Sequence, residues 1–595
     1  MAKPGVGYPQ VEPTATALMD RRVVGYPAGR GVAPALDAAR RAGAAMLVLG
    51  TRRAVRRRDL DRASRWGLAR LRAEDVGWDD LAVVPATAPE IAARHLLIGG
   101  APMILVRDDR KVVGVVDAED VEVARPTLSI THRLERLEDG EARLWLLRVA
   151  GKVGEGLGAP VFAVGGFVRD LLLGRAAPDV DLLVEGDGVA FARRLREEIG
   201  GRLVIHQEFA TASIEGAAGP AGPPLGRIDI ASARREQYDA PGALPVVSVA
   251  TVDEDLRRRD FSVNALAVAL QPSAFGRLLD PLGGQVDLKR RRLRPLHPLS
   301  FVEDPTRMFR AARYASRLGF HLDRGGMRAL RLALRVGDYP ALSGQRLRAE
   351  INLMASEPRA WRGFELLLTW NVLTLWDRAY RKSPRSVHRV RAAGRLCTWA
   401  RRAGIPLDPG EVAVVALLAD QGAALVTRCL ARLALTGEPG RRLRAAAAAG
   451  GLARRLDGAR GRRPSEVAES LRACSLQMLA GAWLHGGPRA RRRIEWFLSR
   501  GRAVRPLLSG DDVVALGVPR GHEVGECLAA LRRLRLDGVV KTRSHERAFV
   551  SAWRPERGHA GMRRRRRAEG SRASVSGRAA APASAAGSNR KGGVR

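Results

Sequence analysis

Residues 163–185 read AVGGFVRDLLLGRAAPDVDLLVE, the most informative pattern in the chain. An apolar run ends at Gly165 and Gly166, a helix-forming stretch follows, and Asp179 and Asp181 lie two residues apart in a second apolar run. Side chains at positions i and i+2 of a strand point to the same face. The segment therefore predicts a strand, a glycine turn, a helix and a second strand with two carboxylates side by side.

This arrangement suits nucleotidyl transfer. Two carboxylates can hold two Mg²⁺ ions, which bind the attacking and leaving oxygens of an in-line displacement. Backbone N–H groups of a glycine turn at a helix N-terminus can bind a triphosphate. We therefore predict Asp179 and Asp181 as catalytic residues and metal ligands. Each half also has a structural explanation, since a glycine pair can be a tight connection and an Asp-x-Asp pair a solvated strand end.

A third acid follows in a short apolar segment. Asp229 lies between two isoleucines at 227–230, where alternation leaves it half-exposed. It is a candidate third catalytic carboxylate, which would accept the proton of the attacking hydroxyl or complete the metal shell. The alternative is an ordinary outward-facing strand residue.

Length and composition limit the class of protein. The 595 residues are too many for one hydrophobic core and predict several domains. A net charge of +38 favours a polyanionic partner, although a general bias toward Ala, Gly and Arg also contributes to it. The four cysteines have no C-x-x-C spacing, and no apolar run is long enough for a membrane helix. We expect a cytoplasmic protein without disulfides, zinc or a membrane partner.

These motifs resemble the nucleotidyltransferase head shared by class II tRNA nucleotidyltransferases and bacterial poly(A) polymerases, with GG-x-VRD-x-LLG followed by D-x-D. DLRRRDFSVNALAVAL at 255–270 and FVEDPTRMFRAARYASRLGF at 301–320 resemble further motifs of the same family, as do 278–288, 344–351 and 507–543. The resemblance implies an α+β, polymerase-β-like head followed by an all-α neck, body and tail.

The resemblance also implies residue roles. Triphosphate and ribose would be held by Gly165, Gly166, Arg169, Arg258, Arg259, Asp260 and Asn264. Asp304 and Arg307 would hydrogen-bond the incoming base, Glu303 would orient Arg307, and Arg310 follows on the same helix face. A helix-capping acid with an i,i+3 ion pair is the structural alternative for Asp304 and Arg307.

Two further segments carry expectations about local structure. The apolar residues of 255–270 predict a helix packed on one face. Pro241, Gly242 and Pro245 predict that 233–251 contains no regular element. In the tRNA enzymes a flexible loop here helps to reshape the pocket for the terminal adenosine. Because the interval has full length, an enzyme that adds only cytidines is disfavoured.

The region before the head resembles a pair of cystathionine-β-synthase-type (CBS) modules. Strands at 103–106 and 112–116 and an acidic helix start at 117–120 form the second half, and 32–66 would be a degenerate first half without a clear pattern of paired strands. Asp59 and Asp120 lie near the family's ribose-binding positions. The sequence leaves open whether this module binds an adenine nucleotide or only packs.

The expected organisation has seven parts. They are a flexible N-terminus at 1–20, a CBS-like pair at 21–125, the head at 126–290, a base-selecting neck at 291–345, an RNA-binding body at 346–505, a C-terminal RNA-binding element at 506–556 and a disordered basic tail at 557–595. Gly517, Gly521 and Gly525 in the C-terminal element would allow close approach of RNA or of another helix.

The resemblance implies addition of CCA, or of its terminal A, to the tRNA 3′ end from CTP and ATP, with two Mg²⁺ ions. Poly(A) polymerase is the nearer alternative, although the chain lacks the G-R-[RK]-F-type segment of those enzymes. A nucleotide-sensing RNA-binding protein without catalysis is the other. The sequence does not give the oligomeric state.

Overall fold

The computed structural model describes residues 13–121, 129–136, 140–175, 179–206, 211–219, 225–458 and 462–553. The chain divides into two compact units, one of residues 1–454 with 475–487 and one of 455–474 with 488–595. Within the described ranges, every helix is too short or too polar to cross a membrane. The expected tail at 557–595 lies outside the described residues.

The N-terminal module, residues 13–121, repeats one topology twice. Each half has three strands, the first parallel to the second and the second antiparallel to the third. The first half comprises β1 (Val23–Gly25), α1 (Val32–Arg41), β2 (Met46–Val48), β3 (Ala54–Arg56) and α2 (Arg57–Arg65). The second comprises β4 (Ala82–Pro85), α3 (Glu90–Ile98), β5 (Met103–Asp108) and β6 (Lys111–Asp117).

Three expectations about this module are wrong. The first half does have paired strands, but β2 and β3 have three residues each and are buried throughout, so no alternation is visible in the sequence. Asp117 ends strand β6 instead of beginning a helix, because its buried carboxylate pairs with Arg56 at 2.6 Å. Residues 13–20 are not loose, since Ala15 is fully buried and Asp20 bridges to Val115 of β6.

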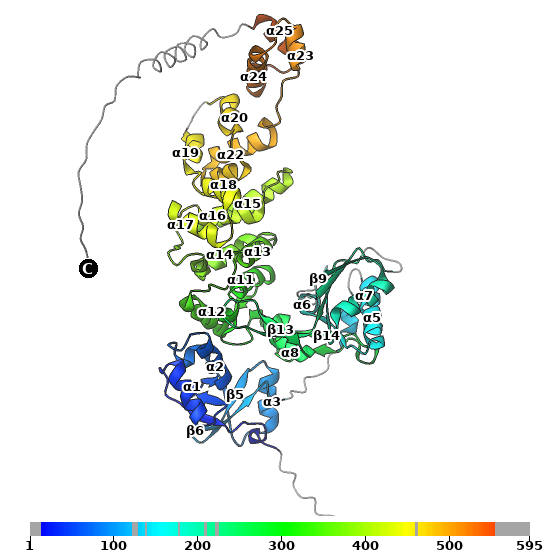
Figure 1. Ribbon diagram of the computed structural model, residues 1–595, viewed down its shortest axis with the longest axis vertical. Coiled ribbons are helices and arrows are strands. Elements are labelled where there is room, and N and C mark those ends of the chain that lie inside the picture. Colours follow the sequence, from blue (N-terminus) through cyan, green and yellow to red (C-terminus); the bar gives the residue numbers. More distant parts are fainter. Residues whose placement is uncertain are drawn as a thin grey trace, which may run out of the picture. The chain divides into compact units, whose positions relative to one another are not determined.

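The head is built on a seven-stranded sheet. Its strand order is β15-β14-β7-β8-β11-β10-β9, and only β8 and β11 are parallel. Helices α5 (Gly140–Gly156) and α7 (Gly188–Ile199) pack together and against the sheet (Figure 1). The strands are β7 (Val161–Val164), β8 (Val180–Val184), β9 (Arg202–His206), β10 (Thr211–Glu215), β11 (Ile228–Ser232), β14 (Ala267–Ala269) and β15 (Leu278–Leu279). The predicted strand, turn, helix and strand are present, with α6 (Gly165–Leu172) between β7 and β8.

Two predictions about the head are wrong. Residues 255–270 are not one helix, because α8 (Val252–Arg257) ends before Arg258 and the chain later enters β14, which lies between β7 and β15. Residues 261–270 are all buried, so their apolar pattern does not distinguish a helix from a central strand. The interval 233–251 contains an antiparallel hairpin of β12 (Arg234–Gln237) and β13 (Val246–Val249), and its prolines lie in the connecting loop.

The neck follows the head. Helix α9 (Gly284–Lys289) still belongs to the predicted head, and the neck comprises β16 (Arg292–Leu293), α10 (Ser300–Glu303), α11 (Thr306–Leu318), β17 (His321–Leu322) and α12 (Arg324–Val336). The neck is therefore not all-α as predicted, because β16 and β17 pair with each other in parallel. Asp287 is fully buried and accepts hydrogen bonds from Ser262 and Arg294, at 2.9 Å from the latter. It thereby joins the second motif of the head to the neck.

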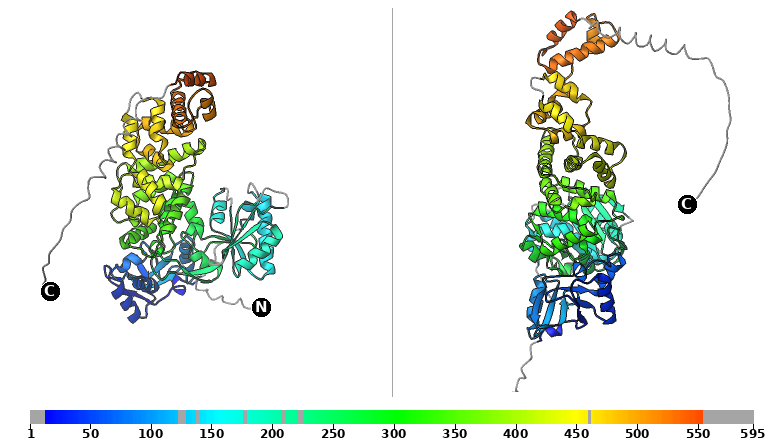
Figure 2. Two further views of the ribbon diagram at one scale, coloured as in Figure 1. Left: turned by 45° about the horizontal axis from the view of Figure 1, so that its top comes forward. Right: turned by 90° about the vertical axis from the view of Figure 1, so that its left-hand side faces the viewer.

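The described residues after β17 are helical, as predicted, and the body is seen from two further sides in Figure 2. These helices are α13 (Gly344–Ala355), α14 (Ala360–Thr369), α15 (Ser386–Arg402), α16 (Pro409–Leu418), α17 (Ala423–Arg432), α18 (Gly437–Ala447), α19 (Gly450–Gly458), α20 (Pro464–Arg472), α21 (Leu476–His485), α22 (Pro488–Trp496), α23 (Gly510–Ala515), α24 (His522–Leu536) and α25 (Arg543–Ala552). A Cβ at Gly517, Gly521 or Gly525 would meet no described atom within 4 Å, so these glycines do not serve close helix packing.

Candidate active site

A cavity of about 670 Å³ brings together residues from Gly165 in the first motif to Glu350, 185 positions further along the sequence. Most of the predicted site residues line it, whereas Asp179, Asp229 and Glu303 lie outside its lining. The predicted residues that line it are Gly165, Gly166, Arg169, Asp181, Arg258, Arg259, Asp260, Asn264, Asp304, Arg307 and Arg310. The cavity therefore collects side chains from the head and from the neck.

Asp179 and Asp181 lie at the start of strand β8. Asp179 is exposed just before β8, and Asp181 is half-buried within it. Burial raises the pKa of the Asp181 carboxyl; nearby Arg259 opposes this shift, and Asp229 and Asp179 add to it. Within the part of the chain that the structure describes, Asp181 makes no hydrogen bond or ion pair, so its carboxylate oxygens have no direct partner.

Asp229 is the direct neighbour of Asp181, because the two residues are partners in the parallel pairing of β8 and β11. Its Oδ1 atom accepts hydrogen bonds from Ser213 Oγ at 2.6 Å and from Arg227 Nε at 2.8 Å. Among the described residues, no group of three His, Cys, Asp or Glu side chains is arranged to hold a metal ion. Because the Asp229 carboxylate is already paired with Arg227, Asp179 and Asp181 remain the candidate pair of metal ligands.

The glycine turn lies against this pair. Gly165 has a φ of +65°, which L side chains rarely adopt. A Cβ at Gly165 would lie 2.8 Å from Arg259 Nη1, and one at Gly166 would lie 3.8 Å from Asp181 Oδ2. The two glycines, which have no side chains, therefore keep open the space between the Arg259 guanidinium and the Asp181 carboxylate. These features fit a divalent cation at Asp179 and Asp181.

A buried network connects the first, second and fourth motifs. Arg169 donates to Asn264 Oδ1 at 2.6 Å, Asn264 donates to Asp260 Oδ1 at 2.9 Å, and Asp260 Oδ2 accepts from Arg310 at 2.8 Å. Because these polar groups are paired with one another, their positions are fixed before any ligand binds. Asp255, which is fully buried, holds Arg258 at 2.6 Å and Arg259 at 2.9 Å in the same way.

The neck arginine Arg307 is held from three sides. Its Nη1 atom donates to Ser300 Oγ at 2.9 Å and to Glu303 Oε2 at 3.2 Å, and Nη2 donates to the Arg258 carbonyl at 3.0 Å. Asp304 does not pair with Arg307; its Oδ1 atom accepts from Arg346 at 2.9 Å and from the Thr306 amide at 3.0 Å. The i,i+3 ion pair of the structural alternative is therefore absent, although Asp304 does cap α11.

Several lining residues were not predicted as site residues. Tyr314 is surrounded by the guanidinium groups of Arg169, Arg310 and Arg313, whose Cζ atoms lie 4.8–5.5 Å from the ring centroid. The helical spacing of α11 could have placed Arg313 and Tyr314 near Arg310. By contrast, Arg346 and Glu350 come from α13, and no local pattern links them to the head. Further unpredicted lining residues are Arg234, Glu236, Tyr238, Leu244, Pro245, Val247, Thr306 and Arg317.

The sheet, the glycine turn and the carboxylate pair define the class: this is an enzyme of the nucleotidyltransferase type. Residues 161–294 match the family described as Poly A polymerase head domain. The CC-adding tRNA nucleotidyltransferase of Deinococcus radiodurans is 34% identical over 414 residues, which cover 69% of this chain and 93% of that enzyme. The chain belongs to the family of tRNA nucleotidyltransferases, whose members typically use divalent metal ions.

Other relatives differ in name and length. The A-adding tRNA nucleotidyltransferase of Geobacter sulfurreducens is 34% identical over 419 residues, 67% of this chain, but the match spans only 46% of that longer relative. The structure of the Thermotoga maritima CCA-adding enzyme complexed with tRNA_CCA matches with a TM-score of 0.60 and 26% identity. That match covers 72% of this chain and 99% of the other.

Proposed function

We propose that this protein adds the CCA sequence, or its terminal A, to the 3′ end of tRNA from CTP and ATP and releases pyrophosphate. One observation carries the proposal: a single cavity contains the glycine turn and Asp181 beside the neck residues Asp304 and Arg307. Phosphate-binding and base-reading groups are thereby placed around one nucleotide-sized space. The relatives named A-adding and CC-adding and the structural relative complexed with tRNA support this substrate class.

In the proposed reaction, the 3′-hydroxyl of the RNA attacks the α-phosphorus of the bound nucleotide. Asp179 and Asp181 would hold two Mg²⁺ ions, which when bound supply charge stabilisation to the attacking and leaving oxygens. The amides of the glycine turn bind phosphate oxygens, and Arg258 and Arg259 provide positive charge beside them. Asp229 accepts the proton of the attacking hydroxyl directly or through water. Arg169, Asp260 and Asn264 fix the ribose side of the cavity.

Base selection is assigned to Asp304 and Arg307. A carboxylate offers only acceptors and a guanidinium only donors, so the pair can be set against the edges of C or A by small rotations. Asp304 pairs with Arg346, and Arg307 pairs with Glu303. These ion pairs support the assignment, because they hold both side chains at the cavity wall. Arg310, on the same helix as Arg307, is bound to Asp260 and belongs to the ribose side of the cavity.

The hairpin β12–β13 favours an enzyme that adds the terminal A. Its loop reaches the cavity through Tyr238, Leu244 and Pro245. Leu244 and Val247, which both line the cavity, are 64% and 40% exposed, which leaves apolar surface available to a base. The similarity to relatives does not decide this point, because relatives of 34% identity bear both the A-adding and the CC-adding names.

The N-terminal module is proposed to be a CBS-like pair that takes an adenine nucleotide. Its support is the repeated topology and a buried Asp59 whose Oδ2 atom lacks a hydrogen-bond partner among the described residues. A rise in melting temperature of the full chain with AMP, retained when Asp181 is replaced by Asn, is the expected result. Two results would contradict the proposal: no rise in melting temperature with AMP, or a rise that Asp59→Ala does not abolish.

The activity is tested with three RNAs: tRNA lacking CCA, tRNA ending in CC, and an unstructured RNA. Each is incubated with labelled CTP or ATP. Incorporation of C followed by a single A, or of a single A on the CC end, supports the proposal. A long A tract on any RNA indicates a poly(A) polymerase, and binding of RNA without incorporation indicates a non-catalytic protein.

A further inference from the structure

Helix α2 of the N-terminal module contacts the base-selecting part of the neck. Arg62 Nη1 lies 3.5 Å from Glu303 Oε1. The other oxygen of the same carboxylate, Oε2, lies 3.2 Å from Arg307 Nη1 and 3.0 Å from His297 Nε2. Glu303 is 8% exposed and Arg307 is 4% exposed, so this carboxylate has few water molecules available to compensate for a missing partner. Arg62 and Arg307 therefore share one buried anion.

A second contact joins the same helix region to the hairpin loop. Trp66, the residue directly after α2, donates its indole N–H to the Tyr238 carbonyl at 3.2 Å. Tyr238 begins the loop between β12 and β13 and lines the active-site cavity. The Arg62 guanidinium lies 5.9 Å from the Trp66 ring centroid, so the two contacts come from one cluster. The module thus contacts both Glu303 of the neck and the first residue of the hairpin loop.

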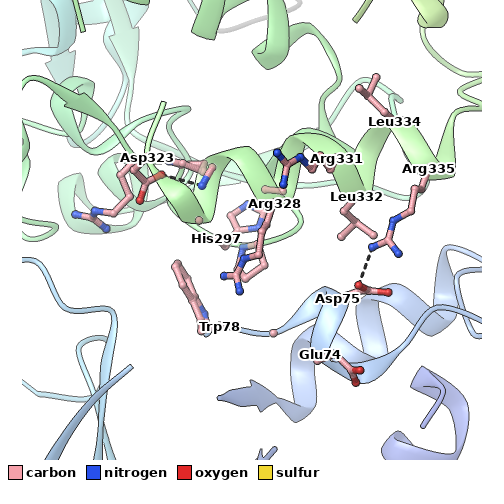
Figure 3. A pocket seen from close by; sticks show the side chains of 17 residues that line it. Glu74, Asp75, Trp78, His297, Asp323, Arg328, Arg331, Leu332, Leu334 and Arg335 are labelled. Carbon is pink, nitrogen blue, oxygen red and sulfur yellow. Dashed lines mark hydrogen bonds and ion pairs between the residues drawn. The ribbon is translucent and has the colours of Figure 1, made fainter. Parts of the chain in front are cut away.

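The module is anchored to the neck beside these contacts. Asp75 pairs with Arg335 of α12 at 2.7 Å, and Asp79 pairs with Arg328 of the same helix. Figure 3 shows Trp78, His297 and Arg328 around a cavity of about 480 Å³ between the two parts. These anchors fix α2 relative to α10 and α11.

We propose that Arg62 is a positioning residue for base selection, acting through Glu303 on Arg307. The inference rests on the proposed role of Asp304 and Arg307 in reading the base. A carboxylate placed between two guanidinium groups divides its attraction between them. Without the Arg62 charge, Glu303 binds Arg307 and His297 more strongly, and Arg307 presents its donors to the cavity at a different angle. The N-terminal module thereby contributes to nucleotide choice without touching the nucleotide.

The test is the selectivity of the full chain on tRNA ending in CC, given as the ratio of kcat/KM for ATP to that for CTP. Arg62→Met keeps the aliphatic part and removes the charge, whereas Arg62→Lys keeps a charge. Arg65→Met, an exposed arginine on the same helix, is the matched control. We expect Arg62→Met to change the ratio about 3- to 10-fold, Arg62→Lys to restore part of it, and Arg65→Met to match wild type.

A second measurement separates positioning from general destabilisation. The Arg62→Met effect on the ratio should disappear in a Glu303→Gln background, since the path through the carboxylate is then gone. Equal loss of ATP and CTP activity, or an unchanged ratio in a folded Arg62→Met protein, would overturn the proposal. If the wild-type protein transferred no nucleotide, the proposed function would fail, and the ratio of ATP to CTP affinities of the same variants would still test Arg62.

Discussion

At Gly165 the chain turns from β7 into α6 with a φ of +65°. We expect Gly165→Ala to cost about 1–2 kcal/mol of stability for the left-handed backbone. It should also lower kcat/KM for the nucleotide at least about 10-fold, since the new Cβ displaces Arg259 from beside Asp181. Unfolding in urea and steady-state kinetics measure the two effects.

Gly174→Ala is the matched control for this substitution. Its φ of +64° is nearly the same, but a Cβ there meets no atom within 4 Å. It should therefore lose similar stability and keep its kcat/KM. Equal kinetic effects of the two substitutions would show that crowding of Arg259 is unimportant.

Asp181 is the residue on which the proposed chemistry depends most. Asp181→Asn should lower kcat at least about 100-fold, because metal-bound charge stabilisation is worth several kcal/mol and each 1.4 kcal/mol is tenfold. With a chelator present, the same change should not lower the melting temperature, because it removes a negative charge that burial disfavours. Asp253→Asn on α8, where the carboxylate is half-exposed, should leave kcat unchanged. A fully active Asp181→Asn enzyme would contradict the metal assignment.

Glu303 provides a prediction about acid stability. Burial alone would raise its pKa, but His297, Arg307 and Arg62 outweigh burial and lower the pKa to about 2 from an ordinary 4.5. A depressed pKa gives stability that is present above pH 4.5 and is lost as the pH falls toward 2. The full effect is on the order of 3 kcal/mol. Urea unfolding between pH 5 and pH 3 should show a shallower loss in Glu303→Gln than in wild type, and parallel losses would contradict this.

At the scale of elements, the strand, turn, helix and strand at 161–184 could be predicted because glycine, apolar runs and strand alternation are local signals. The error at 255–270 has a physical cause. Residues 261–270 of that segment are buried throughout, so their pattern carries no period, and β14 is defined by pairing with β7 and β15. In the same way, the neighbouring positions of Asp181 and Asp229 follow from the parallel pairing of β8 and β11, which a sequence does not state.

The arginine partners could not be predicted either. Three arginines on one helix face, Arg307, Arg310 and Arg313, indicate a basic surface. Each is instead paired with a carboxylate: Arg307 with Glu303 of the same motif, Arg310 with Asp260 of the second motif, and Arg313 with Glu350 of α13. Glu350 of α13 lies 3.5 Å from Arg310, and it was not a predicted site residue. The partners of Arg310 and Arg313 come from distant parts of the sequence, so helical spacing alone does not show which arginines remain available to a ligand.

The hairpin β12–β13 carries the next prediction. Replacing the loop at 239–244 by a short Asn-Gly turn removes the hydrogen bonds of the buried Gly242 with Glu303 and Arg346, so we expect a folded protein with a lower melting temperature. It should lower A addition to tRNA ending in CC at least about 10-fold and affect C addition less, since the loop forms one wall of the cavity. Single-turnover incorporation of each nucleotide measures the difference, and equal losses for A and C would argue against a base-specific role.

At the scale of the whole molecule, the net charge of +38 predicts salt-dependent binding of RNA. Residues 557–595 include the run Arg563 to Arg567. Removing them should weaken tRNA binding at low salt and reduce the slope of log K against log salt by about 0.7–0.9 for each phosphate that the shortened chain no longer neutralises. The kcat at saturating tRNA should not change, because the described residues that line the catalytic cavity fall between Gly165 and Glu350. An unchanged slope would show that the tail does not bind RNA.

The central claim is that one cavity combines a two-carboxylate transfer site with a base-reading pair that completes a tRNA end. The most direct test is the mass of the product formed from tRNA ending in CC with ATP and Mg²⁺, for wild type and for Asp181→Asn. We expect an increase of one adenylate with wild type, no further growth on longer incubation, and no product with the variant. An extended adenylate tract, or product from the variant at the wild-type rate, would contradict the claim.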